Sequence, residues 1–300
     1  MSGTNKGFNR RQFVAATAGA AAAGALGLRG RDGEGAENTS RTSRVVLIRR
    51  EDAVDGDGSP NGVALHELLN HAVAAVCEGD EAKLAWSRLF GAGDVVGIKS
   101  NEWGRLPTPA ALEQAILAEV VGAGVDPAMV AVGDRGVRRD EVFQRATALV
   151  NIRPMRTHAW SGLGTLLKNL IMFVPRPAEY HGDSCAPLGS IWLLPELEGK
   201  VRLNILVMLT PQFHSLGPHS YSREFVWPYC GLIVSTDPVA ADATGARIIL
   251  AKRRQHFGDD RPISPPPHHS EIADTRSGLG VSDPERIDLI RLGWEEDALI

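Results

Sequence analysis

The stretch DVVGIKSNEWG (residues 94–104), followed by TPAALEQAILAEVVGAG (108–124) and AMVAVGD (128–134), decides the fold class. The first and last segments are short apolar runs typical of buried strands, and the middle segment has the apolar spacing of a helix. Thr108 is expected to cap this helix, with Pro109 in its first position. A strand, a crossover helix and a second strand form a βαβ unit, in which the two strands pair in parallel.

Other segments of the chain extend this pattern in both directions. Apolar runs bounded by turn residues predict strands, and segments with helical apolar spacing predict helices. Strands are expected at 44–50, 147–155, 201–209 and 229–236, and helices at 63–79, 138–146, 237–254 and, as a short final helix, 283–294. We therefore expect a single α/β domain over residues 44–300, with a largely parallel or mixed sheet flanked by helices.

The N-terminal segment predicts an export signal. Arg10 and Arg11 precede an uncharged, Ala- and Gly-rich run at 14–28. A helix over this run would be about 22 Å long, too short for a hydrocarbon core of about 30 Å. The paired arginines resemble a twin-arginine signal, which export machinery reads and which is no stable membrane anchor. We expect a signal peptide at 1–31, a disordered leader at 32–43 and export to the periplasm or extracellular space; a disordered basic tail is the alternative.

Charge and cysteine content exclude two classes of function. Removal of the signal takes away five basic and no acidic residues, so 27 of the 32 basic residues remain against 36 acidic ones, a net charge of −9. Nucleic-acid binding depends on positive charge, so no nucleic-acid partner is expected. Cys77, Cys185 and Cys230 are dispersed and form no iron–sulfur ligand set. We expect buried thiols, although export would permit one disulfide whose pairing stays open.

An interval without acidic residues is the main candidate for function. No Asp or Glu lies between Glu141 and Glu179. The basic residues and histidine of this interval are Arg145, Arg153, Arg156, His158, Lys168 and Arg176. Positive charge concentrated on an otherwise acidic protein attracts small anions. We therefore expect a small carboxylate or phosphate as the ligand; arginines that only solvate strand ends are the alternative.

Lys168 and Asn169 lie inside the apolar stretch HAWSGLGTLLKNLIMFVP (158–175), which is expected to form a buried helix from about Leu163. A buried ammonium group must find a negative partner or lose its proton. Lys168 is therefore expected to act as an electrostatic clamp or as a base. A lysine whose amine extends to solvent is the alternative.

Two further pairs of polar residues follow predicted strands. Lys99 and Asn101 end the strand of the 94–104 segment, and open α/β sheets bind ligands outside the carboxyl ends of their strands. Asp237 is expected to cap the helix that follows it. Asp242 lies about 140° further around that helix, so the two carboxylates are no acid–base pair on one face.

The histidines offer an incomplete metal site. His181 and Cys185 have the i, i+4 spacing of two ligands on a helix, which is too few for a site. A complete site would need help from His158, His214 or His219. We expect no metal site, and we expect PPPHHSE (265–271) to lie at the surface.

Several stretches together resemble a known family, the domain of unknown function 362 family. They are VGIKSN (96–101), RTHAWSGLGTLLKNLIMFVP (156–175), His181 and GLIVSTDPVAADATGARII (231–249). The similarity spans about residues 44–293. SGLGVSDPERIDLIRLG (277–293) resembles the exported branch of the family, in which twin-arginine signals are common.

The resemblance implies an α/β fold and a set of motif residues, but no defined reaction. The motif positions are Lys99, Asn101, His158, Lys168, Asn169, His181, Asp237 and Asp242. Because many members carry or neighbour ferredoxin modules, the resemblance implies a ferredoxin-like partner for any redox role of this chain. Ser100 stands where the family usually has proline, and Val207 where an aspartate is expected, which argues against a carboxylate-dependent step.

Two hypotheses of function follow. In the first, the protein is an enzyme in which Lys168 and His158 act as acid–base or charge-stabilising groups on an anionic substrate. The residues expected to bind that substrate are Lys99, Asn101, Arg156, Asn169 and His181, with Asp237 and Asp242 in structural or site roles. The alternative is a non-catalytic binding or accessory protein of an exported redox complex. The sequence specifies neither the cofactor nor the reaction.

Overall fold

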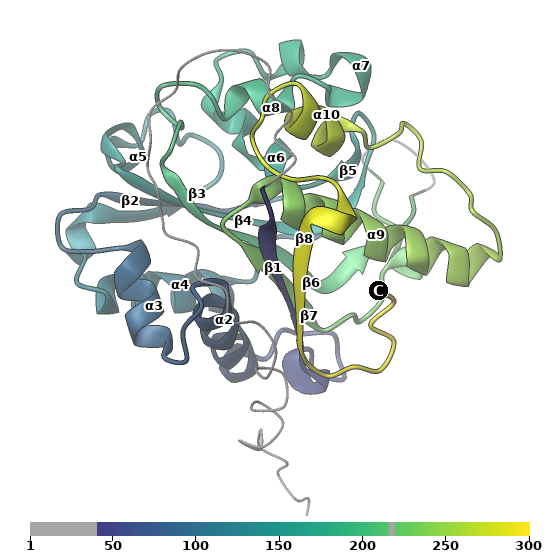
Figure 1. Ribbon diagram of the computed structural model, residues 1–300, viewed down its shortest axis with the longest axis horizontal. Coiled ribbons are helices and arrows are strands. Elements are labelled where there is room, and N and C mark those ends of the chain that lie inside the picture. The colour runs from purple at the N-terminus through teal and green to yellow at the C-terminus, as the bar shows by residue number, and fades with distance from the viewer. Residues whose placement is uncertain (1–40, 216–219) are drawn as a thin grey trace, which may run out of the picture. The chain divides into compact units, whose positions relative to one another are not determined.

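A computed structural model describes residues 41–215 and 220–300, whose strands form one eight-stranded sheet with helices on both faces (Figure 1). The strand order is β3-β2-β4-β6-β7-β1-β8, with β5 paired to β4 beside this path. The strands are β1 (Ser43–Arg49), β2 (Val96–Lys99), β3 (Val130–Gly133), β4 (Ala148–His158), β5 (Gly162–Gly164), β6 (Val201–Gln212), β7 (Gly231–Ser235) and β8 (Ile287–Gly293).

Most strand pairs are parallel. Strand β2 lies parallel to β3 and β4, β4 parallel to β6, and β1 parallel to β8. Strand β7 is antiparallel to both of its neighbours, and β5 is antiparallel to β4. The expected α/β class with a largely parallel, mixed sheet is confirmed. Strand β2, helix α4 (Ala110–Gly122) and strand β3 form the βαβ unit that the sequence predicts.

The helices divide between the two faces of the sheet (Figure 1). One face carries α2 (Gly62–Val76), α3 (Ala82–Leu89) and α4 (Ala110–Gly122). The remaining helices do not belong to this group. They are α5 (Glu141–Arg145), α6 (Leu166–Asn169), α7 (Gly182–Cys185), α8 (Leu188–Ile191), α9 (Pro238–Phe257) and α10 (His269–Thr275). Short 3-10 turns occur at Glu51–Ala53, Pro127–Met129, Leu170–Phe173, Pro177–Tyr180, Arg223–Phe225 and Pro284–Arg286.

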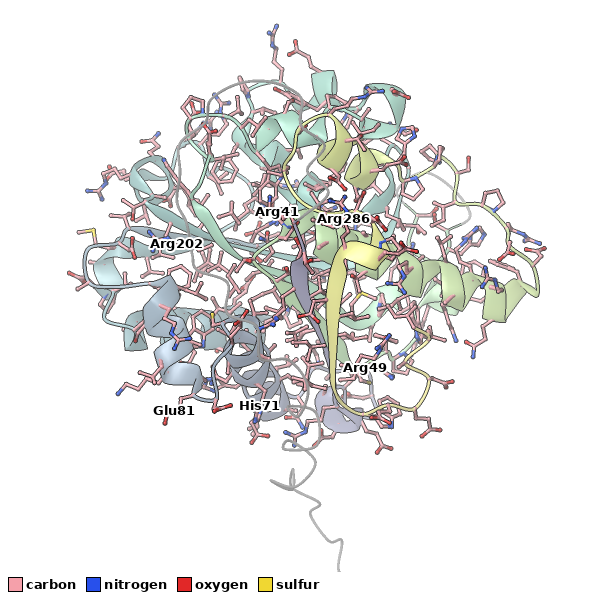
Figure 2. All side chains as sticks on the ribbon, viewed as in Figure 1. Arg41, Arg49, His71, Glu81, Arg202 and Arg286 are labelled. Carbon is pink, nitrogen blue, oxygen red and sulfur yellow. The ribbon has the colours of Figure 1, made fainter. Side chains whose placement is uncertain are left out.

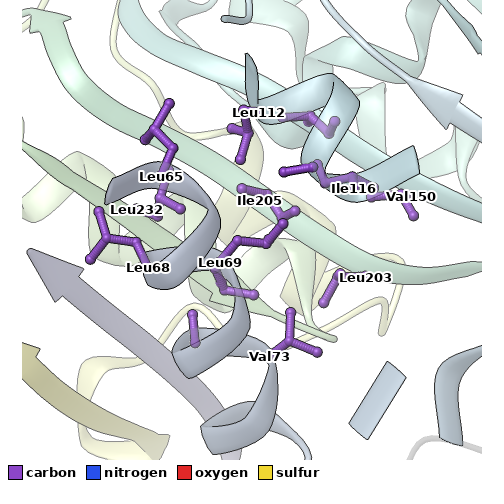
Figure 3. Close-up of a cluster of buried hydrophobic side chains, with 14 of the residues drawn as sticks. Leu65, Leu68, Leu69, Val73, Leu112, Ile116, Val150, Leu203, Ile205 and Leu232 are labelled. Atoms are coloured by element: carbon purple, nitrogen blue, oxygen red, sulfur yellow. The ribbon is translucent and has the colours of Figure 1, made fainter. Parts of the chain in front are cut away.

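The alternation of side chains along the central strands separates two packed layers. On β6, Ile205 belongs to the apolar cluster beneath α2 and α4, and the next residue, Leu206, belongs to the cluster beneath α9. Figure 3 shows Leu69 of α2 and Ile116 of α4 directed toward Ile205 in the first cluster. Complete burial of each such side chain contributes about 1.5–3 kcal/mol, so these layers hold the sheet between its helices.

The C-terminal segment is held by an arginine on β1. The Arg49 guanidinium (labelled in Figure 2) lies 4.2 Å from the ring centroid of Tyr229 and 4.4 Å from that of Trp294. It also donates hydrogen bonds to the carbonyl oxygens of Tyr229 and Glu296. Because the guanidinium is enclosed by two rings and paired with backbone acceptors, its burial is compensated.

Two predictions of helix position are wrong. Helix α4 begins at Ala110 with Pro109 as its N-cap, while Thr108 instead accepts a hydrogen bond from the Asn101 N–H at 3.2 Å. The final segment 283–294 forms a 3-10 turn and then strand β8, because β1 offers a parallel partner along its whole length. Short apolar runs do not distinguish a strand from a helix by their spacing.

The buried helix expected within 158–175, from about Leu163, is also wrong. Strand β4 continues to His158, and Gly162–Gly164 returns as β5, antiparallel to it. Gly162 has a φ of +69°, a left-handed conformation suited to glycine. Only Leu166–Asn169 is α-helical, and a 3-10 turn at Leu170–Phe173 follows. Pairing with β4 satisfies the backbone of β5 in place of helical hydrogen bonds.

The signal peptide expected at 1–31 lies outside the described residues, as does the leader except for its last three residues. Within the described part of the chain, no helix is long and apolar enough to span a bilayer.

Candidate functional site

The carboxyl ends of β2 and β3 bring a lysine and an aspartate together. The Nζ of Lys99 donates to Oδ1 of Asp134 at 2.6 Å and to the Ser100 carbonyl oxygen at 2.6 Å. Burial lowers the pKa of Lys99 to about 8, against the opposing effect of the Asp134 carboxylate. Burial raises the pKa of Asp134, but Lys99 and the Glu102 N–H outweigh it, so this pKa lies below its ordinary value.

Asn169 connects this pair to the neighbouring strand. Its Oδ1 accepts from Lys99 Nζ and from Asn101 Nδ2, both at 3.3 Å. Its Nδ2 donates to Asn151 Oδ1 at 2.8 Å and to the Ile152 carbonyl oxygen at 2.9 Å. The expected grouping of Lys99, Asn101 and Asn169 is therefore present in three dimensions. Since Asn169 is saturated by protein groups, it positions Lys99 and Asn101.

Strand β4 contributes two buried arginines. Arg153 and Arg156 are 4% and 5% exposed, and the buried Nε of each lacks a hydrogen-bond partner among the described residues. The Arg156 guanidinium lies 4.0 Å from the ring centroid of Trp103. Burial lowers the pKa of Arg153 to about 10; burial and the charge of Arg153 lower that of Arg156 to about 8. Unlike Lys99, neither arginine forms a salt bridge within residues 41–215 and 220–300.

Gly164 allows β5 to cover Arg153. A Cβ atom at position 164 would lie 2.8 Å from Nη2 of Arg153, closer than a carbon approaches a neighbouring nitrogen. The glycine therefore lets the β5 backbone lie directly against the guanidinium.

Lys168, on α6, faces a thiol. Its Nζ lies 3.6 Å from Sγ of Cys185, and the residue is 3% exposed. Burial lowers the pKa of Lys168 to about 8, with the Cys185 sulfur opposing the shift; burial also raises the pKa of Cys185. The Lys168 amine is therefore buried, as expected, and does not extend to solvent as in the alternative.

The backbone at Cys185 rules out the helical i, i+4 arrangement with His181. Asp183, Ser184 and Cys185 have φ angles of 47°, 53° and 66°, in the left-handed region that L-residues rarely occupy. The described residues contain no group of three or more metal-ligating side chains.

His269 corrects the expectation of a surface PPPHHSE segment. Its ring is completely buried, and Nε2 shares a 2.9 Å hydrogen bond with Thr165 Oγ1. Burial and then the charge of Lys168 lower its pKa to about 3, so this histidine is neutral. His269 is therefore a neutral, buried group that lies within the electrostatic influence of Lys168 and Arg153.

The two aspartates of the α9 region serve the backbone. Asp242 accepts the N–H groups of Leu166 and Leu167, each at 2.9 Å, and thereby caps α6 from a distant helix. Burial raises the pKa of Asp242 to about 7, against these hydrogen bonds. Asp237 caps α9 as expected, accepting from Val239 and Ala240.

His158 and His181 lie on either side of Trp160. Nδ1 of His158 accepts from the Trp160 N–H at 3.3 Å, and the His181 ring stacks on the indole with centroids 4.2 Å apart. Trp160 is 46% exposed. His158 and His181 thus both contact Trp160, a partly exposed residue. Lys168 instead contacts Cys185.

Four buried cations make up what we call the cationic cluster: Lys99, Arg153, Arg156 and Lys168. Arg153 acts electrostatically on each of the other three. The buried carboxylates that act on this cluster are Asp134 and Asp242. When all six groups are ionised, two positive charges remain uncompensated.

Comparison with known proteins finds a family match that covers three residues of the cationic cluster. Residues 135–247 match the family model described as Domain of unknown function (DUF362). The match confirms the resemblance over this range, which contains Arg153, Arg156 and Lys168, whereas Lys99 and Asp134 precede it. No curated protein and no solved structure matches the chain.

Sequence reasoning did not identify Asp134 and Trp103 as partners of the basic residues. Asp134 follows β3 as Lys99 ends β2, so the strand-end argument applied to both strands of the βαβ unit would have found it. No sequence signal identifies the contact between Trp103 and Arg156, because loop 101–109 must first fold back over β4.

Proposed function

We propose that the protein binds a small anion, a carboxylate or a phosphate, at the cationic cluster. The observation that carries the proposal is that Arg153 and Arg156 are buried and that neither forms a salt bridge within the described residues. An unpaired buried charge costs several kcal/mol, and an anionic ligand offsets that cost. Guanidinium groups suit the purpose because their paired N–H donors match carboxylate and phosphate oxygens.

The four cations have different roles in this proposal. Arg153 and Arg156 provide unpaired donors for the ligand, while Lys99 is held by Asp134 and Asn169 and contributes its field. Lys168 is the group that exchanges a proton with the ligand, because a pKa of about 8 lies close to neutral pH. That low pKa favours an enzyme over a purely binding protein.

Binding can be measured by calorimetric titration with phosphate and with oxalate. Arg156→Met is expected to weaken binding at least tenfold, since it removes a charged donor. Arg145→Met, a change of an exposed arginine on α5, is the matched control and should bind like the wild type. Equal affinities of the wild type and Arg156→Met for every anion would refute the proposal.

The pH dependence of binding gives an independent test. A bound anion raises the pKa of Lys168 above its value of about 8 in the free protein. Affinity is therefore expected to be highest below pH 8 and to fall as the pH rises through 8 and beyond, with proton uptake on binding near pH 8. Affinity that stays constant from pH 7 to pH 10 would contradict this assignment.

We also propose, from the sequence of residues 1–31, that the protein is exported by the twin-arginine route. Arg10 and Arg11 support this proposal. Replacing both with lysine should retain the full-length precursor in the cytoplasm, as measured by fractionation. Unchanged export of the double variant would refute it.

A further inference from the structure

A pocket of about 540 Å³ lies against the C-terminal halves of β4 and β6, on the face of the sheet that carries α2 and α4. Three parts of the chain line it: residues of the loop 54–60, the segment 106–111 at the start of α4, and the strand residues Pro154, Val207, Leu209 and Thr210. Threonines 108 and 210 are the polar side chains of this lining; the other lining side chains are apolar. The volume falls within the range of about 300–1,000 Å³ typical of small-molecule sites.

The pocket borders the cationic cluster through two short connections. The turn from Trp103 to Leu106 is closed by a 2.9 Å backbone hydrogen bond; Trp103 stacks on Arg156, and Leu106 lines the pocket. On β4, Pro154 lines the pocket, and Arg156 follows two residues further along the same strand.

A third connection joins the pocket to Asn101. Thr108, which lines the pocket, accepts from the Asn101 N–H at 3.2 Å and donates its own N–H to the Asn101 carbonyl oxygen at 2.9 Å. The buried Oδ1 of Asn101 has no hydrogen-bond partner among the described residues. Asn101, whose side-chain amide contacts Asn169, is therefore joined through its backbone to the pocket lining.

We propose that the ligand is an amphiphilic acid, whose apolar body occupies this pocket while its single anionic group binds at Arg156. The inference rests on the proposed anion binding and specifies its ligand class. An inorganic anion fills only a small part of the volume, and the apolar lining offers no partner for a second charge. An aliphatic or aromatic body satisfies both the volume and the lining.

The experiment is a calorimetric series of straight-chain carboxylates from acetate to octanoate, with the matching alkyl phosphates as a second arm. Each added methylene is expected to tighten binding about fourfold until the pocket is filled. The better arm identifies the anionic group.

Two variants in which a larger side chain fills the pocket test whether the apolar body of the ligand binds there. Ala110→Trp on α4 and Thr210→Phe on β6 change partly or fully exposed residues of the pocket lining and should abolish the dependence on chain length while acetate binds as before. Ala118→Trp, at an exposed position of the same helix outside the pocket, is the control and should retain the dependence.

The outcomes separate this inference from the proposed function. Anions that bind with no dependence on chain length, or a dependence that survives in both filled variants, would overturn the inference and leave anion binding intact. If alcohols bind as tightly as acids of the same length, the link to Arg156 is wrong. If no acid binds, the proposed function fails with it.

Discussion

Replacing Lys168 with methionine should stabilise the unliganded protein. The pKa of Lys168 falls from an ordinary 10.5 to about 8 on folding. Each pKa unit corresponds to about 1.4 kcal/mol, so the protonated amine costs the folded state roughly 3 kcal/mol at neutral pH. Methionine keeps an unbranched apolar chain of similar length beside Cys185 and carries no charge. We therefore expect a gain of about 1–3 kcal/mol in the free energy of unfolding.

The pH dependence identifies the cause of this gain. Between pH 8 and 10.5 the unfolded chain holds a proton on Lys168 that the folded protein has released, so wild-type stability rises with pH in this window. The penalty is complete below pH 8 and disappears as the pH approaches 10.5. The difference between variant and wild type should therefore shrink across the same window.

Urea denaturation at pH 7 and at pH 10 measures both quantities, with Lys83→Met, at an exposed position of α3, as the control for loss of a surface lysine. A variant less stable than the wild type at pH 7, or a difference that does not change with pH, would refute the view that Lys168 is a strained, buried cation. The same variant should also lose affinity for anions, so stability and binding are expected to change in opposite directions.

Other predictions concern the groups around the cluster. Asp134→Asn leaves Lys99 without its carboxylate and should lower the unfolding free energy by about 3–5 kcal/mol, measured by denaturant titration; a change under 1 kcal/mol would contradict a buried ion pair. Asp242→Ala removes the acceptor of two buried N–H groups and should cost roughly 2–4 kcal/mol, with amide exchange fastest at α6. Gly164→Ala should displace Arg153 and weaken anion binding more than it lowers the melting temperature, and unchanged anion affinity would argue against an arginine held by β5.

Local signals account for the parts of the fold that sequence reasoning predicted correctly. Asp237 before a proline caps α9, and the strand–helix–strand pattern at 94–134 forms a parallel unit, because caps and periodicity depend on neighbouring residues. The same reasoning failed for 158–175 and 283–294, where β4 and β1 provided strand partners. Pairing with a distant strand outweighs local helix preference in short apolar segments.

The sequence by itself determined an α/β class, an interval free of acidic residues and a lysine in an apolar segment, because composition and spacing are properties of the chain alone. Tertiary structure decided which groups contact each buried charged side chain. Asp134 reaches Lys99 from the next strand, Cys185 faces Lys168, and the buried Nε atoms of Arg153 and Arg156 find no hydrogen-bond partner among the described residues. Contacts between residues distant in sequence arise only when the sheet assembles, and the electrostatic balance of a buried site depends on those contacts.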